Sequence, residues 1–118
     1  IPLEDAVFNL SHTALLLEAL RAGDERLLAQ AMQDRLHQPY RARFIPGFQA
    51  VCQAALGAGA AGAALSGAGP SVLAFAFGRE AEVGRAMAQA FERHGVASHW
   101  RSLPIDLQGL QITAAPDP

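Results

Sequence analysis

A glycine-rich loop, Ser66-Gly67-Ala68-Gly69-Pro70-Ser71, lies between two apolar segments and is the stretch of this chain most suited to chemistry. Gly67 and Gly69 permit positive φ and add no side-chain bulk, while Pro70 fixes its own φ and has no N–H donor. In such a tight loop, backbone N–H groups can converge on an anion, or the backbone can pack closely on another backbone. Taken alone, the loop is either an anion-binding loop or a plain hairpin turn inside a core sheet.

The loop matches neither of the two best-known nucleotide-binding patterns. A dinucleotide fingerprint needs a third glycine and a helix directly after the loop, and a Walker A loop needs a Lys-Ser/Thr pair. Neither follows Ser71, where a second apolar segment begins.

A second candidate is the polar segment His37-Gln38-Pro39-Tyr40-Arg41-Ala42-Arg43, which interrupts the apolar pattern around it. Pro39 disfavours helix at Gln38, so we expect a short connector, and binding residues are often found on connectors. Acid–base chemistry by His37 with Asp34, or by His94 with His99, is a weaker interpretation, because the spacing within each pair is unremarkable. Four histidines without a matching set of cysteines or carboxylates predict no metal site.

The composition narrows the classes of protein. The 118 residues, 51% of them hydrophobic, suit one folded domain, and the net charge of −2 argues against nucleic-acid binding. No apolar run approaches a membrane span. The single cysteine, Cys52, is expected to be a buried small hydrophobe and indicates a reducing compartment, so we expect a cytoplasmic protein. A start at Ile1 rather than Met suggests a processed chain or a piece of a larger protein.

Four helices and four strands are expected to position these segments. Apolar residues at helical spacing predict helices over 2–22, 25–36, 46–56 and 80–94, the first two forming an antiparallel pair. Strands are predicted on both sides of the loop, within 61–77, and at 96–103 and 110–113. Trp100 is expected to pack in the core or an interface. This order predicts an α+β sandwich with helices covering one face of a mainly antiparallel sheet.

Four segments together resemble the C-terminal domain of the GHMP kinases, the superfamily of galactokinase, homoserine kinase, mevalonate kinase and phosphomevalonate kinase. They are Asp5–Ser11, Asp34–Arg41, Ile45–Gly47 and Leu65–Ser71. The last resembles the superfamily's third motif, and the His-Gln-Pro-Tyr-Arg segment is most similar to the homoserine kinases. The resemblance covers nearly the whole chain.

The resemblance implies a ferredoxin-like fold that lacks its usual first strand, with residues 1–118 as one C-terminal domain. Nothing in the chain resembles the Pro-x-x-x-Gly-Leu-Gly-Ser-Ser-Ala-like loop of the superfamily's N-terminal ATP-binding domain. We therefore expect a fragment of a longer kinase that is inactive alone. The chain's own last strand, a homodimer or the absent domain could complete the sheet, since an open edge invites pairing.

The resemblance also implies three substrate contacts. Arg41 matches an arginine that holds the substrate's carboxylate, which a guanidinium can grip through two hydrogen bonds. His12 stands where the family is expected to have an arginine, and a neutral imidazole grips a carboxylate less well. Asn9 would orient neighbouring groups. Each also has a simpler interpretation, as a surface arginine, an ordinary helix histidine and a polar helix position.

The third motif would lie near the transferring phosphoryl group, where backbone dipoles act on developing charge. Its candidate residues are Ser66, Gly67, Ala68, Gly69 and Ser71. The superfamily's catalytic acidic residue belongs to the N-terminal half, so no catalytic residue is expected here. ATP and Mg²⁺ would be bound mainly by that half, and the substrate would be L-homoserine, on the route to threonine.

Two other functions stay open. A ferredoxin-like domain could bind an amino acid in a regulatory role without chemistry, and the missing ATP loop beside an intact Arg41 segment fits that alternative. The chain could also belong to another GHMP kinase with a different alcohol substrate. The His-Gln-Pro-Tyr-Arg segment argues against that alternative, whereas His12 weakens the argument.

Overall fold

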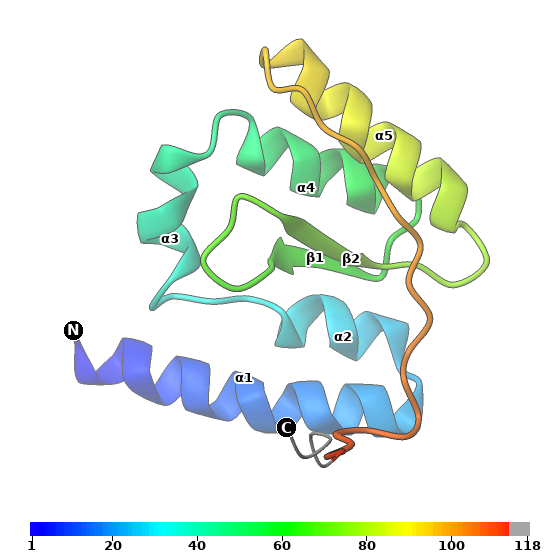
Figure 1. Cartoon of the computed structure of the whole chain (residues 1–118). Coiled ribbons are helices and arrows are strands. Elements are labelled where there is room, and N and C mark those ends of the chain that lie inside the picture. Colours follow the sequence, from blue (N-terminus) through cyan, green and yellow to red (C-terminus); the bar gives the residue numbers. More distant parts are fainter. Residues whose placement is uncertain (114–118) are drawn as a thin grey trace, which may run out of the picture.

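The computed structural model describes residues 1–113, and it confirms the α+β class. Figure 1 shows the helices arranged around a single β-hairpin. In chain order the elements are α1 (Leu3–Ala22), α2 (Glu25–Ala31), α3 (Gln38–Arg41), the 3-10 turn η1 (Ala42–Phe44), α4 (Phe48–Gly57), β1 (Gly62–Leu65), β2 (Val72–Phe75) and α5 (Glu80–Arg93).

The hairpin is antiparallel, with Leu65 opposite Val72, and it lies between α4 and α2 (Figure 1). Because side chains alternate along a strand, its two faces meet different helices. Ala63, Leu65 and their cross-strand partners pack on the layer formed by α4 and α5. On the opposite face, Gly62 contacts Met32 at the end of α2. The predicted helical cover of one face is therefore present, and α2 adds a contact on the other.

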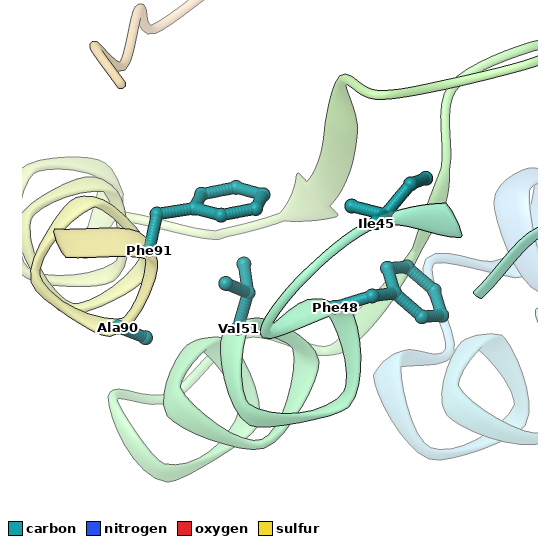
Figure 2. Packing of buried hydrophobic residues seen from close by; sticks show 5 residues of the cluster. All are labelled: Ile45, Phe48, Val51, Ala90 and Phe91. Carbon is teal, nitrogen blue, oxygen red and sulfur yellow. The ribbon is translucent and has the colours of Figure 1, made fainter. Parts of the chain in front are cut away.

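The largest buried cluster joins α4 to α5. Ile45, Phe48 and Val51 pack against Ala90 and Phe91, and Val51 is completely buried (Figure 2). The spacing of Phe48 and Val51 follows one helical face. This cluster supports the glycine-rich loop from below. Ile45 of the cluster contacts the loop, because a Cβ added at Gly69 would lie 2.7 Å from Ile45 Cδ1.

The predicted antiparallel pair of α1 and α2 is present (Figure 1). Gly23 ends α1 in the left-handed conformation at φ 65° and donates its N–H to Ala19. Asp24 then caps α2 by accepting hydrogen bonds from the N–H groups of Arg26 and Leu27, as predicted.

Two predicted boundaries in this region are wrong. The second helix does not reach residue 36 but ends at Ala31, because the carboxylate of Asp34 takes hydrogen bonds from the following N–H groups and redirects the chain. The segment containing Pro39 is the short helix α3 rather than a non-helical connector. Pro39 fits there because it lies in the first turn, where its missing N–H would have had no intrahelical partner.

The two predicted strands at 96–103 and 110–113 are absent from the described residues. A strand needs a neighbour with free backbone groups, and this segment instead leaves the end of α5 as an extended chain (Figure 1). Within residues 1–113 the chain's last strand therefore does not complete the sheet, contrary to that expectation. The predicted tail at 116–118 lies outside the described residues.

The ring of Trp100 lies against Gly84 of α5 and helps to anchor this segment. A Cβ at Gly84 would lie 2.8 Å from Trp100 Cγ and would overlap the rest of the indole. Trp100 is 40% exposed, so it covers a helix surface rather than filling the core. This outcome corresponds to the packing role predicted for it.

We expect Gly84→Ala to displace Trp100 and to destabilise the chain by about 1–3 kcal/mol through overpacking. Because Trp100 is the chain's one tryptophan, its fluorescence emission should shift to longer wavelength as the ring becomes exposed. Gly57→Ala is the matched control, since a Cβ there meets nothing within 4 Å. If Gly84→Ala leaves both the emission and the urea midpoint unchanged, the anchoring role of this contact is refuted.

Candidate functional site

Arg41 of α3 reaches the glycine-rich loop. Its Nε and Nη2 both donate to the carbonyl oxygen of Ala68, at 3.1 and 2.9 Å. The guanidinium also lies 5.8 Å from the ring of Phe44. Two of the sequence-predicted sites, 27 residues apart, thus form one site. Only Nη1 and the remaining Nη2 hydrogen are left to bind a ligand, and Arg41 is half-buried, which limits the directions of approach.

The loop is closed by its own backbone. Ser66 N donates to Ser71 O at 2.9 Å, and Gly69 N donates to Ser66 O at 3.1 Å. Gly67 and Gly69 have φ of 57° and 77°, the left-handed region that glycine favours. The N–H groups of Gly67, Ala68 and Ser71 have no hydrogen-bond partner among the described residues. They are the donors that this loop could offer to an anion.

Gln38 holds α3 against the sheet, a role that sequence reasoning missed. Its Oε1 accepts a hydrogen bond from Leu65 N at 2.8 Å, and its Nε2 donates to Met32 O at 3.4 Å. Leu65 is the last residue of β1, directly before the loop. The one available signal was an amide side chain, with both a donor and an acceptor, three residues before Arg41.

Asp34 and Asn9 fix the start of α3. Asn9 Nδ2 donates to Asp34 Oδ1 at 2.6 Å, and Asn9 Oδ1 accepts from Arg35 N at 2.9 Å. The Asp34 carboxylate also accepts hydrogen bonds from the N–H groups of residues 36–38. Burial acts to raise the pKa of Asp34, but the hydrogen bonds from Asn9 and the backbone outweigh it and hold that pKa below its usual value. Asn9 therefore orients the connector.

Because its pKa is lowered on folding, Asp34 contributes stability above its ordinary pKa of 3.8, and this is lost as the pH falls through the lowered value. We expect Asp34→Asn to destabilise the chain by about 2 kcal/mol at pH 7, since it weakens hydrogen bonds to a charged group. The gap from wild type should shrink as the pH falls below 3.8. Urea unfolding at pH 7 and at acid pH measures this difference in unfolding free energy between wild type and variant. A difference that does not change with pH would contradict the role of the Asp34 carboxylate.

His12 belongs to a separate cluster on α1. Its ring stacks on Phe8 with the centroids 3.7 Å apart, and its Nδ1 lies 2.8 Å from the Phe8 carbonyl oxygen. Arg35 covers the Phe8 ring at 3.9 Å. Among residues 1–113, His12 makes no polar contact with Arg41 or the loop. Its predicted substrate contact stays a prediction.

A largely apolar cavity of about 510 Å³ is lined by residues of α2, α3, α4 and β1. Its lining includes Met32, Gln38, Phe48 and Cys52, but neither Arg41 nor the loop. Burial raises the pKa of the Cys52 thiol to about 11, so it stays protonated and unreactive at neutral pH. Cys52 is half-buried against the main core, as expected of a small hydrophobe.

The structure shows neither a metal centre nor a membrane span within residues 1–113. No three histidine, cysteine or carboxylate side chains lie close enough to hold a metal ion. None of the described helices combines the length and the apolar composition that crossing a bilayer requires.

Comparison with known families decides the classification. The family GHMP kinases C terminal matches residues 16–93 of this chain. The chain belongs to the GHMP kinase C-terminal family. The match includes α2, α3, the hairpin and α5, and hence both parts of the candidate site.

Relatives of this GHMP kinase C-terminal domain include several homoserine kinases. That of Moorella thermoacetica is 54% identical over 96 residues, or 81% of this chain and 32% of the relative. That of Synechococcus sp. (strain CC9902) is 49% identical over 118 residues, or 99% of this chain and 38% of the relative. The chain thus spans about a third of the length of these relatives.

A solved structure agrees with this assignment. The crystal structure of homoserine kinase from Cytophaga hutchinsonii superimposes with a TM-score of 0.73 at 39% identity. The overlap covers 79% of this chain and 30% of the other. The GHMP C-terminal fold is consistent with the ferredoxin-like arrangement predicted from the sequence.

Proposed function

We propose that this chain is the substrate-side C-terminal domain of a cytoplasmic homoserine kinase. The complete enzyme would transfer the γ-phosphoryl group of ATP to the hydroxyl of L-homoserine, in threonine biosynthesis. The observation that carries the proposal is the pair of hydrogen bonds from Arg41 to the Ala68 carbonyl oxygen, because a guanidinium beside the third-motif loop could bind the substrate's carboxylate. The homoserine kinases among the relatives support this choice of substrate.

Arg41 would bind the carboxylate of homoserine through its remaining guanidinium N–H groups. Gly67 and Ala68 would direct their N–H groups toward the phosphoryl group, where developing negative charge benefits most from fixed dipoles. Gln38 and Asp34 would act indirectly, because their hydrogen bonds hold α3 in place beside the loop. Asn9 would serve the same positioning role, and His12 would contact substrate only after rearrangement or through a group outside this chain.

ATP and Mg²⁺ would be held mainly by a domain that this chain does not contain. The described residues would contribute only a minor part of that binding, because they provide three free N–H groups in the loop but no cluster of metal ligands. Bound there, Mg²⁺ would neutralise charge on the phosphates during transfer. We expect the isolated chain to be inactive, with the partner domain and L-homoserine completing the site.

A chimera tests the substrate assignment. The part of the Moorella thermoacetica enzyme that precedes the matched segment would be joined to this chain, and ATP turnover measured with L-homoserine and with 3-aminopropan-1-ol. The second alcohol is homoserine without its carboxylate. We expect kcat/KM for homoserine to be about 100-fold higher, the value of a good charge-assisted bidentate contact of about 2.7 kcal/mol.

A second chimera controls for mismatch between the joined parts. It carries the corresponding C-terminal segment of the Gloeobacter violaceus homoserine kinase, which is 65% identical to this chain over 74 residues. If the Gloeobacter chimera discriminates between the two alcohols and the chimera with this chain turns over both equally, the homoserine assignment is wrong. If the chimera with this chain binds homoserine without any turnover, the non-catalytic alternative replaces the kinase assignment.

A further inference from the structure

The half-buried ring of Phe8 on α1 lies between two polar side chains. The His12 ring stacks on it with the centroids 3.7 Å apart and 23° between the planes, and Cζ of Arg35 lies 3.9 Å from the Phe8 centroid. Two planar groups this close to one ring cannot share a face, so His12 and Arg35 cover opposite faces of Phe8. The guanidinium is attracted by the negative face of the ring, and flat stacking fixes its orientation.

Three contacts join Arg35 to one side of α1. Its guanidinium covers Phe8, and its Nη1 lies 3.7 Å from Asp5 Oδ1. Its backbone N–H donates to Asn9 Oδ1 at 2.9 Å. The α1 residues of this cluster have the spacing that places side chains on one side of a helix. They are Asp5, Phe8, Asn9 and His12. This side of α1 therefore holds the chain at residue 35.

The connector held in this way leads directly to Arg41. Asp34, next to Arg35, accepts hydrogen bonds from the N–H groups of residues 36–38, where α3 begins. Because α3 has only four residues, its own hydrogen bonds are too few to set its position. Arg41 is its last residue and donates to Ala68 of the loop. A shift of the connector would therefore move the Arg41 guanidinium relative to the loop.

We propose that Phe8 is a positioning residue of the carboxylate site. By holding Arg35 it fixes the connector, and so it sets where the Arg41 guanidinium can meet a carboxylate. This inference rests on the proposed function, to which the carboxylate site belongs. Gln38 fixes α3 to the end of β1, whereas Phe8 fixes the preceding chain to α1, so the two anchors together define the position of α3.

NMR of the 118-residue chain tests the coupling without any substrate. The Arg41 Nε–H donates to a carbonyl oxygen at 3.1 Å, so its exchange with water should be slowed. Phe8→Leu keeps an apolar side chain but removes the ring, and we expect this exchange to become severalfold faster. Phe8→Tyr keeps the ring and should behave as wild type. Phe77→Leu is the matched control, since Phe77 is 51% exposed and lies outside this cluster. Unchanged Arg41 exchange in Phe8→Leu overturns the proposal.

Arg35→Ala removes the same contact from the other side. The fold should tolerate this change, because the Arg35 side chain is 53% exposed. Exchange of the Arg41 Nε–H should rise as it does in Phe8→Leu. The double variant should be no worse than the more affected single variant, because two residues that act through one contact are not additive. Additive effects would mean that Phe8 and Arg35 act separately, and they would overturn the proposal.

Kinetics of the Moorella chimera relates this coupling to the substrate. Phe8→Leu should raise the KM for L-homoserine about tenfold and change kcat, and the KM for 3-aminopropan-1-ol, by less than about twofold, because only the carboxylate contact is misplaced. A merely structural role would instead impair turnover of both alcohols alike, and Phe8→Tyr should restore the wild-type KM.

The two proposals fail in different ways. A wild-type chimera that does not discriminate between the alcohols refutes the proposed function, while the NMR experiment still decides whether Phe8 positions Arg41. A wild-type chimera that discriminates, beside a Phe8→Leu variant with an unchanged KM for homoserine, overturns the positioning role of Phe8 alone.

Discussion

Replacing Arg41 by alanine in the Moorella chimera should raise the KM for L-homoserine about 100-fold. Among residues 1–113, Arg41 carries the one guanidinium that donates hydrogen bonds to the loop. A bidentate contact with a carboxylate contributes about 2.7 kcal/mol, or about two factors of ten. The variant also loses two hydrogen bonds to Ala68, so a fall in kcat of a few fold is expected as the loop loosens. Steady-state ATP turnover at varied homoserine measures both effects.

Two comparisons separate substrate binding from folding. Turnover of 3-aminopropan-1-ol should fall in Arg41→Ala only as far as the loop is loosened, because this alcohol has no carboxylate that Arg41 could bind. Arg43→Ala is the matched control, since Arg43 is exposed and lies 4.8 Å from the ring of Phe44 without reaching the loop. Equal effects of Arg41→Ala on both alcohols would mean that Arg41 supports the loop and does not hold the carboxylate.

Gly69→Ala should destabilise the chain strongly. Gly69 has φ of 77°, where an L-residue is strained by about 1–2 kcal/mol. Its new Cβ would lie 2.7 Å from Ile45 Cδ1 and 3.3 Å from Leu65 Cδ2. Ile45 is 6% exposed and fixed in the main core, so it cannot move aside easily. We expect a loss of about 2–4 kcal/mol of unfolding free energy in urea denaturation.

Gly67→Ala provides the matched comparison two residues away. Gly67 has φ of 57°, but a Cβ there meets nothing within 4 Å. This variant should therefore show the conformational cost alone, about 1–2 kcal/mol. If the two variants are equally destabilised, packing of the loop on Ile45 of the main core does not hold the loop in place.

The sequence predicted the features whose cause is local. Apolar segments on both sides of Ser66–Ser71 correctly predicted the hairpin and its loop. Gly23 and Asp24 correctly marked the turn between the first two helices. The resemblance to GHMP kinases was correct because its motifs include residues, such as Arg41, that the fold brings to the loop.

Features that depend on distant groups could not be predicted in this way. α3 forms because Asp34 collects backbone N–H groups and Gln38 bonds to Leu65, which is 27 residues away. The strands predicted at 96–103 and 110–113 have a suitable pattern, but a strand also needs a hydrogen-bonding neighbour. Val7, Leu10 and Leu17 of α1 have helical spacing but are exposed. Spacing alone does not indicate which side of the helix faces the core.

Homoserine-dependent ATP turnover, measured for the Moorella chimera and for its two parts separately, shows whether this chain is the substrate-side part of a homoserine kinase. We expect turnover that requires both ATP and L-homoserine in the chimera, and none in either part alone. A folded chimera that transfers no phosphoryl group, beside an active Gloeobacter control, would refute the assignment, as would homoserine phosphorylation by the 118-residue chain alone.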